Sequence, residues 1–137
     1  AQVSTHLARR DPQRAINWLS ELPSGDGQNA GMRRAMREWT HRDPAAASEH
    51  LVAMPDSDAK DAAIRGLSDQ LVWEDPAAAI AWAQTISSED RRTETLISTG
   101  RSWKRKDAQG AEEWVASSNL PQEVREAILS SPERDDD

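Results

Sequence analysis

The sequence predicts an all-α protein, organised as an α-solenoid of stacked helix-turn-helix hairpins with a 32-residue period. Three observations predict this class. Alanine, the strongest helix former, occurs 21 times in the 137 residues. Asp-Pro pairs, which favour helix starts, recur at a constant interval at Asp11, Asp43 and Asp75, and Asp107 falls at the next interval. Apolar residues also recur at the same interval without gaps, as expected of a repeat array.

The recurring columns hold the residues expected to face the core. Four of these columns are Ala15, Ala47, Ala79 and Ala111; Trp18, His50, Trp82 and Trp114; Met32, Ile64, Leu96 and Ile128; and Trp39, Leu71 and Trp103. Because the register holds over four units, a repeated structural unit explains the pattern better than chance does.

The first helix of each unit is predicted to begin at the Asp-Pro pair. An Asp at the N-cap accepts hydrogen bonds from free backbone N–H groups, and Pro at the first helical position loses no bond. The residues that follow in unit one have helical spacing and form one apolar stripe, Ala15, Trp18, Leu19 and Leu22. Pro23 and Pro55 are expected to end this helix in the first two units.

The second helix of each unit follows a polar turn and carries its own stripe. The three stripes are Met32, Ala35 and Trp39; Ile64, Leu67 and Leu71; and Leu96, Thr99 and Trp103. A helix of about 12 residues is marginal in isolation, and one hairpin cannot bury its own apolar face. Stacked hairpins can bury these faces against one another, which is the organisation of an α-solenoid.

The repeat divides the chain into one domain and a tail. We expect a domain over residues 1–131, with units 11–42, 43–74, 75–106 and 107–131, and an acidic tail over 132–137. Residues 1–10 align with 33–42, so they predict a partial helix and further repeats upstream. This arrangement predicts an exposed apolar edge at Val3, Leu7 and Trp18, through which the chain could self-associate.

The bulk composition excludes several classes. The net charge of −7 argues against nucleic-acid binding, which requires clustered Lys and Arg. The longest apolar run has seven residues, from Ala77 to Ala83, whereas a membrane helix needs about 20. The absence of cysteine excludes disulfides and thiolate metal sites. It is compatible with any redox compartment, so it does not predict where the protein is located.

The hairpins with Ala, Trp and Pro at fixed offsets resemble tetratricopeptide-type and related helical-repeat arrays over about residues 3–130. The 32-residue unit and the lack of Tyr match no single subfamily, since a tetratricopeptide unit is slightly longer and contains a Tyr. Such arrays act as scaffolds for proteins or peptides. The resemblance therefore implies a protein-binding module without a cofactor.

The sequence offers little catalytic chemistry. His6, His41 and His50 do not form a zinc-binding spacing. Asp56, Asp58 and Asp61 are similar to part of a calcium loop, but the required Gly and Glu are missing, so we interpret them as the acidic start of a helix. We expect a non-enzymatic interaction module. The alternatives are a structural spacer or terminal cap of a larger protein, and an enzyme or metal site completed by upstream residues.

Two surface features are candidates for binding a partner. Basic residues off the apolar stripes of the second helices are expected to form a strip for an acidic partner segment: Arg33, Arg37, Arg65, Arg101 and Lys104. The alternative is an ordinary solvated face. Trp73 falls outside the repeated apolar columns and is a candidate exposed anchor, because Trp is enriched in binding hot spots. Its alternative is local packing beneath a turn.

Overall fold

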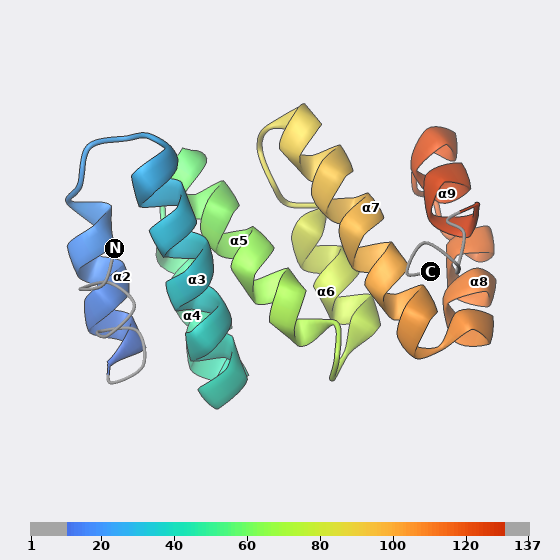
Figure 1. Cartoon of the computed structure of the whole chain (residues 1–137), viewed down its shortest axis with the longest axis horizontal. Coiled ribbons are helices and arrows are strands. Elements are labelled where there is room, and N and C mark those ends of the chain that lie inside the picture. The colour runs from blue at the N-terminus through green and yellow to red at the C-terminus, as the bar shows by residue number, and fades with distance from the viewer. Residues whose placement is uncertain (1–10, 131–137) are drawn as a thin grey trace, which may run out of the picture.

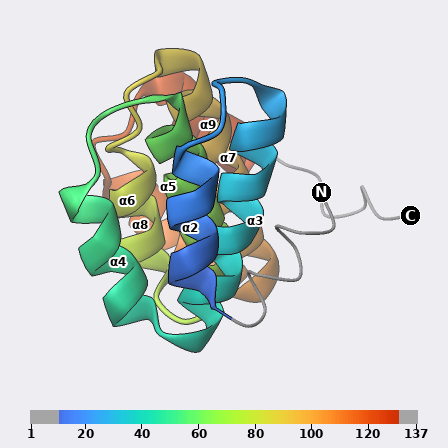
Figure 2. The same cartoon turned by 90° about the vertical axis from the view of Figure 1, so that its left-hand side faces the viewer.

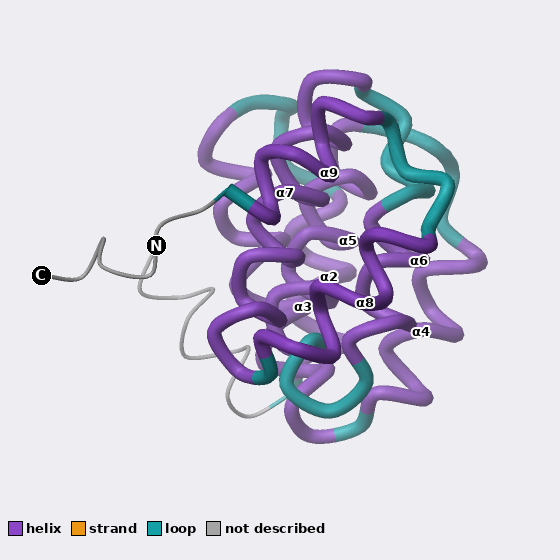
Figure 3. Tube along the Cα trace, turned by 90° about the vertical axis from the view of Figure 1, so that its right-hand side faces the viewer, coloured by secondary structure: helices purple, strands orange, loops and turns teal. Residues whose placement is uncertain are grey.

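The computed structural model describes residues 11–130, which form eight α-helices and no strand (Figure 1, Figure 3). The helices are α2 (Pro12–Ser20), α3 (Asp26–Arg42), α4 (Pro44–Ala53), α5 (Asp58–Leu71), α6 (Pro76–Ala83), α7 (Glu89–Lys106), α8 (Ala108–Ser117) and α9 (Gln122–Leu129). The predicted all-α class is confirmed. Between Asp11 and Ser130, no helix combines the length and apolarity that a bilayer crossing requires.

Four helices begin at the aspartates that the sequence marks as N-caps. The carboxylates of Asp11, Asp43, Asp75 and Asp107 each accept a hydrogen bond from the backbone N–H three residues later, over 3.1–3.2 Å. Ser57 and Ser88 cap α5 and α7 in the same way. The start of α3 differs, since it follows Gly25 with a φ of 151°, a conformation in which a side chain would be strained.

The helices pack mostly in chain order and form two layers. Each helix contacts the next, and α3, α5, α7 and α9 also contact one another in succession. Viewed from the end, α4, α6 and α8 lie on one side of the molecule and α3 and α7 on the other (Figure 2). The row runs from α2 at one end to α8 and α9 at the other (Figure 1).

The core lies between these layers and combines the predicted stripes with buried residues that the stripes did not include, among them Ile16, Met36, Val72, Ile80 and Val124. Every predicted stripe residue of α3, α5 and α7 is buried. The alanines at 15, 47, 79 and 111 are fully buried, as their alignment predicts. The column of Trp18 is buried only in part: His50, Trp82 and Trp114 are half-buried, and Trp18 on α2 is 39% exposed.

We call the layer that contains α3, α5, α7 and α9 the second layer. Its adjacent helices approach one another unequally. α3 and α5 share the most extensive contact of any helix pair, whereas α5 and α7 touch over a short stretch. Gly66 explains the closeness of the first pair: a Cβ there would lie 2.2 Å from the backbone oxygen of Arg33. Ser98, on α7, occupies the position one repeat interval after Gly66. The layer therefore opens between α5 and α7.

One recurring contact was not predicted from the sequence. A long polar side chain in the first turns of α3, α5 and α7 donates a hydrogen bond to a carbonyl six residues earlier. The pairs are Gln28 with Leu22 at 3.1 Å, Lys60 with Met54 at 3.0 Å, and Arg92 with Ile86 at 2.9 Å. Each bond satisfies a carbonyl at or beyond the end of the preceding helix, which would otherwise lack a helical partner.

Candidate interaction surface

The predicted basic strip is largely occupied by contacts within the protein. Arg33 on α3 forms an ion pair with Asp69 on α5 at 2.8 Å. Arg65 on α5 forms one with Glu94 on α7 at 2.5 Å. Each arginine therefore bridges to the following helix of the second layer, and its charge is locally balanced.

The C-terminal members of the strip hold α9 in place. The guanidinium of Arg101 donates to the carbonyl of Ala127 at 3.3–3.4 Å, and Lys104 Nζ donates to the carbonyl of Leu129 at 2.7 Å. Lys104 is only 8% exposed, so the prediction that it lies on the outer face is wrong. Its stem follows the buried side of α7 and its ammonium group reaches the end of α9, where free carbonyls favour a cation.

The two remaining candidates are exposed. Arg37 lies on the open side of α3. Trp73, in the turn after α5, is 47% exposed, and its backbone carbonyl accepts a hydrogen bond from Lys106 on α7. The structure thus keeps Trp73 at the surface and anchors its backbone, while the role of its ring in binding stays a prediction.

A polar hollow of about 250 Å³ lies across α3, α5 and α7. It brings Arg33 and Arg65 together with polar residues that lie outside the predicted basic strip. The additional polar lining consists of Asp26, Asn29, Asp61, Arg91, Glu94 and Thr95. Thr95 stands one repeat interval after Ala63 and two after Gly31, in a column of small residues. This column could have marked Thr95 as a position where neighbouring helices lie close together.

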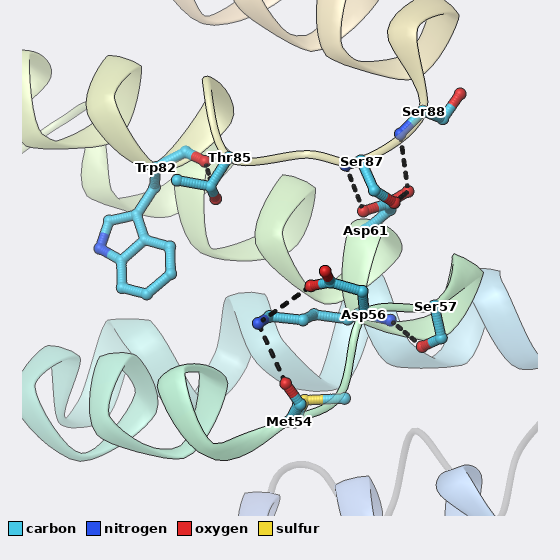
Figure 4. A network of polar contacts seen from close by, with 9 residues as sticks. Met54, Asp56, Ser57, Asp61, Trp82, Thr85, Ser87 and Ser88 are labelled. Carbon is cyan, nitrogen blue, oxygen red and sulfur yellow. Dashed lines mark hydrogen bonds and ion pairs between the residues drawn. The ribbon is translucent and has the colours of Figure 1, made fainter.

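Asp61 is a structural anchor of this region. Its buried carboxylate accepts hydrogen bonds from the backbone N–H of Ser87 at 2.9 Å, the hydroxyl of Ser87 at 2.8 Å and the backbone N–H of Ser88 at 3.2 Å (Figure 4). It therefore ties the start of α5 to the loop before α7. Three donors on one carboxylate leave little capacity for a metal ion.

The two neighbouring acids also form ion pairs. Asp56 lies 3.6 Å from the ammonium of Lys60, and Asp58 forms an ion pair with Arg91 at 3.1 Å. Within residues 11–130, no group of three or more His, Cys, Asp or Glu side chains is arranged to hold a metal ion. Asp58 and Asp61 do stand in the first turn of α5, as the sequence predicts, but their contacts join this turn to α7 and to the loop before it, which the sequence did not predict.

The N-terminal edge carries a second hollow, of about 430 Å³. Trp18, Leu22 and Pro23 contribute to its lining, together with Gly31 and Arg34. Val3 and Leu7, which the sequence analysis places at this edge, lie outside the described residues. Self-association through it stays a prediction.

Two ring pairs join the layers, one toward each end of the molecule. Trp39 packs against His50 with ring centroids 5.2 Å apart, and Trp103 packs against Trp114 at 5.3 Å. Both partners of the second pair stand two repeat intervals after those of the first. Burial lowers the pKa of His50, because the charged imidazolium loses hydration.

Comparison with protein-family models, with curated proteins and with solved structures found no match to this chain.

Proposed function

We propose that this chain is a stack of helical hairpins with a 32-residue period and serves as a non-enzymatic protein-binding module. The caps at Asp11, Asp43, Asp75 and Asp107 support the period, because they share one geometry at equal spacing. The carbonyl contacts of Gln28, Lys60 and Arg92 support it independently, since they recur at the same interval.

The observation that carries the binding role is the hollow across α3, α5 and α7. It crosses three helices that lie side by side, so a partner could contact several units at once. Clefts between rigid elements are the usual places for ligands, and this one is formed without any movement of a loop. Arg37 and Trp73, outside the lining of the hollow, are exposed side chains of the types that are enriched in interfaces.

Charge reversal on the two layers tests this role. Arg91→Glu reverses a partly exposed charge in the lining of the hollow, and Arg14→Glu makes the same change on α2, where it serves as the control. Each variant is used to capture proteins from an extract of the native host. A partner that the wild type and Arg14→Glu retain, and that Arg91→Glu loses, supports the proposal. If both variants retain every partner of the wild type, the hollow is not a binding site and the alternative of a structural spacer is favoured.

A further inference from the structure

The N-terminal edge of the stack presents an apolar surface that no described helix covers. Trp18 on α2 is 39% exposed and lines the hollow of about 430 Å³ at this edge, together with Leu22, Pro23 and Ala30. Apolar side chains gathered around one hollow usually mark a contact with another segment or another molecule. The later units of the chain show which residue covers the equivalent position.

In two later units, a ring of one helix covers a ring at the equivalent position of the next helix. Trp39 on α3 lies against His50 on α4, with ring centroids 5.2 Å apart, and Trp103 on α7 lies against Trp114 on α8 at 5.3 Å. In both pairs, the first ring stands four residues before the capping aspartate and the second stands seven residues after it. The contact therefore has a fixed spacing along the chain.

The same spacing around the first capping aspartate pairs Leu7 with Trp18. Leu7 lies outside the described residues. A leucine and a tryptophan also occupy these two positions around the third capping aspartate, where Leu71 is buried and Trp82 is half-buried. A Leu side chain is thus an established neighbour of the second-layer core at this position of the repeat.

The backbone of Asp11 indicates the direction from which the chain enters α2. Its φ and ψ are −152° and 85°, compared with −154° and 82° at Asp43 and −152° and 84° at Asp107. Asp43 alone joins α3 to α4, and Asp107 alone joins α7 to α8. Because the backbone has only these two soft torsions at each residue, the chain enters α2 from the same direction as α3 enters α4.

We infer that residues 1–10 of this chain cover the N-terminal edge, with the side chain of Leu7 packed on the ring of Trp18. Val3 belongs to the same contact, because it stands in the column of the buried Ala35 and Leu67. The inference rests on the 32-residue period of the proposed function. It assigns the edge to a contact within one chain, in place of self-association.

A double-mutant cycle tests the contact, with urea unfolding followed by the fluorescence of the remaining Trp residues. Leu7→Ala should lower the equilibrium constant for folding roughly fivefold in the wild-type background and leave it nearly unchanged in the Trp18→Ala background. Leu129→Ala is the matched control, since Leu129 on α9 is 36% exposed at the far end of the molecule. Its effect should be the same in both backgrounds. Equal effects of Leu7→Ala in the two backgrounds would overturn the inference.

Nuclear magnetic resonance of the indole N–H groups reports on Trp18 directly, whatever the stability of the variants. The chain has six Trp residues, and the signal that is missing in Trp18→Phe belongs to Trp18, as the signal missing in Trp73→Phe belongs to Trp73. Leu7→Ala should shift the signal of Trp18 and leave the signal of Trp73 in place.

Two results of this measurement would contradict the contact. One is a Trp18 signal that Leu7→Ala does not shift. The other is a Trp18 signal that moves with protein concentration, which would indicate a second copy of the chain at this edge. The proposed binding function is judged separately, by whether Arg91→Glu loses a native partner, because Arg91 lines the other hollow.

Discussion

The contact between α3 and α5 and the contact between α5 and α7 join helices of the same layer, but their structures differ. The first is the most extensive contact between any two helices and brings Gly66 against the backbone of Arg33. The second is short, and polar side chains span it: Arg65 pairs with Glu94, Arg91 pairs with Asp58, and Asp61 holds the loop before α7.

The difference coincides with a change of residue at one position of the unit, from Gly66 to Ser98. Where glycine allows the backbones to meet, the two helices exclude other groups. Where Ser98 takes the equivalent position, the helices stand apart and leave the hollow that Asn29, Arg65 and Thr95 line. The close contact joins the two helices along their backbones, and the open contact leaves the hollow that we propose as the surface for a partner.

The largest effect is expected at the close contact. Gly66→Val places a branched side chain against the Arg33 carbonyl, which is backbone and cannot move aside, so we expect a loss of about 3 kcal/mol in the free energy of unfolding. Gly27→Val is the control, because a Cβ at Gly27 meets nothing within 4 Å. Urea unfolding followed by Trp fluorescence measures both. Equal unfolding midpoints for the two variants would refute the explanation for the close contact.

At the open contact, Asp61 should be the most important polar residue. Asp61→Ala removes the acceptor for three donors of Ser87 and Ser88, so we expect a loss of about 2 kcal/mol. Asp58→Ala removes an exposed pair with Arg91 and should cost less than about 1 kcal/mol. Hydrogen exchange of the backbone N–H of Ser87 and Ser88 should accelerate only in Asp61→Ala. Unchanged exchange there would show that the loop is held by other contacts.

Much of the fold could be predicted because its determinants are local and periodic. The N-caps at Asp11, Asp43, Asp75 and Asp107 need only the residues that follow them, and the buried stripes need only helical spacing. The unequal packing could not be read from these patterns. It depends on which residue of one helix meets the backbone of another, as Gly66 does with Arg33.

The surface was harder to predict for the same reason. Helical spacing places Arg33, Arg65 and Lys104 off the apolar stripes, but it does not show that Asp69, Glu94 and the end of α9 lie within their reach. Long side chains can also bury their stems and present only the charged group, as Lys104 does. Asn29 and Thr95 become candidates only when α3, α5 and α7 are seen around one hollow.

The ion pair between α5 and α7 should have a smaller effect than Asp61. Glu94→Gln leaves the size of the side chain unchanged and removes the attraction to Arg65, so we expect a loss of about 0.5 kcal/mol at low salt. Glu38→Gln is the control, since Glu38 pairs with Arg42 within α3 and spans no helix contact. Hydrogen exchange in the first turns of α7 should increase in Glu94→Gln alone. An equal increase in both variants would mean that the pair does not support the open contact.

The smallest effect concerns the ring pairs at the two ends, and it appears only in the dependence on pH. Burial lowers the pKa of His50 in the folded state, so the unfolded chain binds a proton more readily once the pH falls below about 6.5. Protonation therefore favours unfolding, and the free energy of unfolding should decrease from about pH 7 to about pH 5.5. His50→Trp installs the residue found at Trp114 in the equivalent pair and removes this contribution. Urea titrations at the two pH values should show a smaller decrease in the variant, and the same decrease in both proteins would assign the pH dependence to other groups.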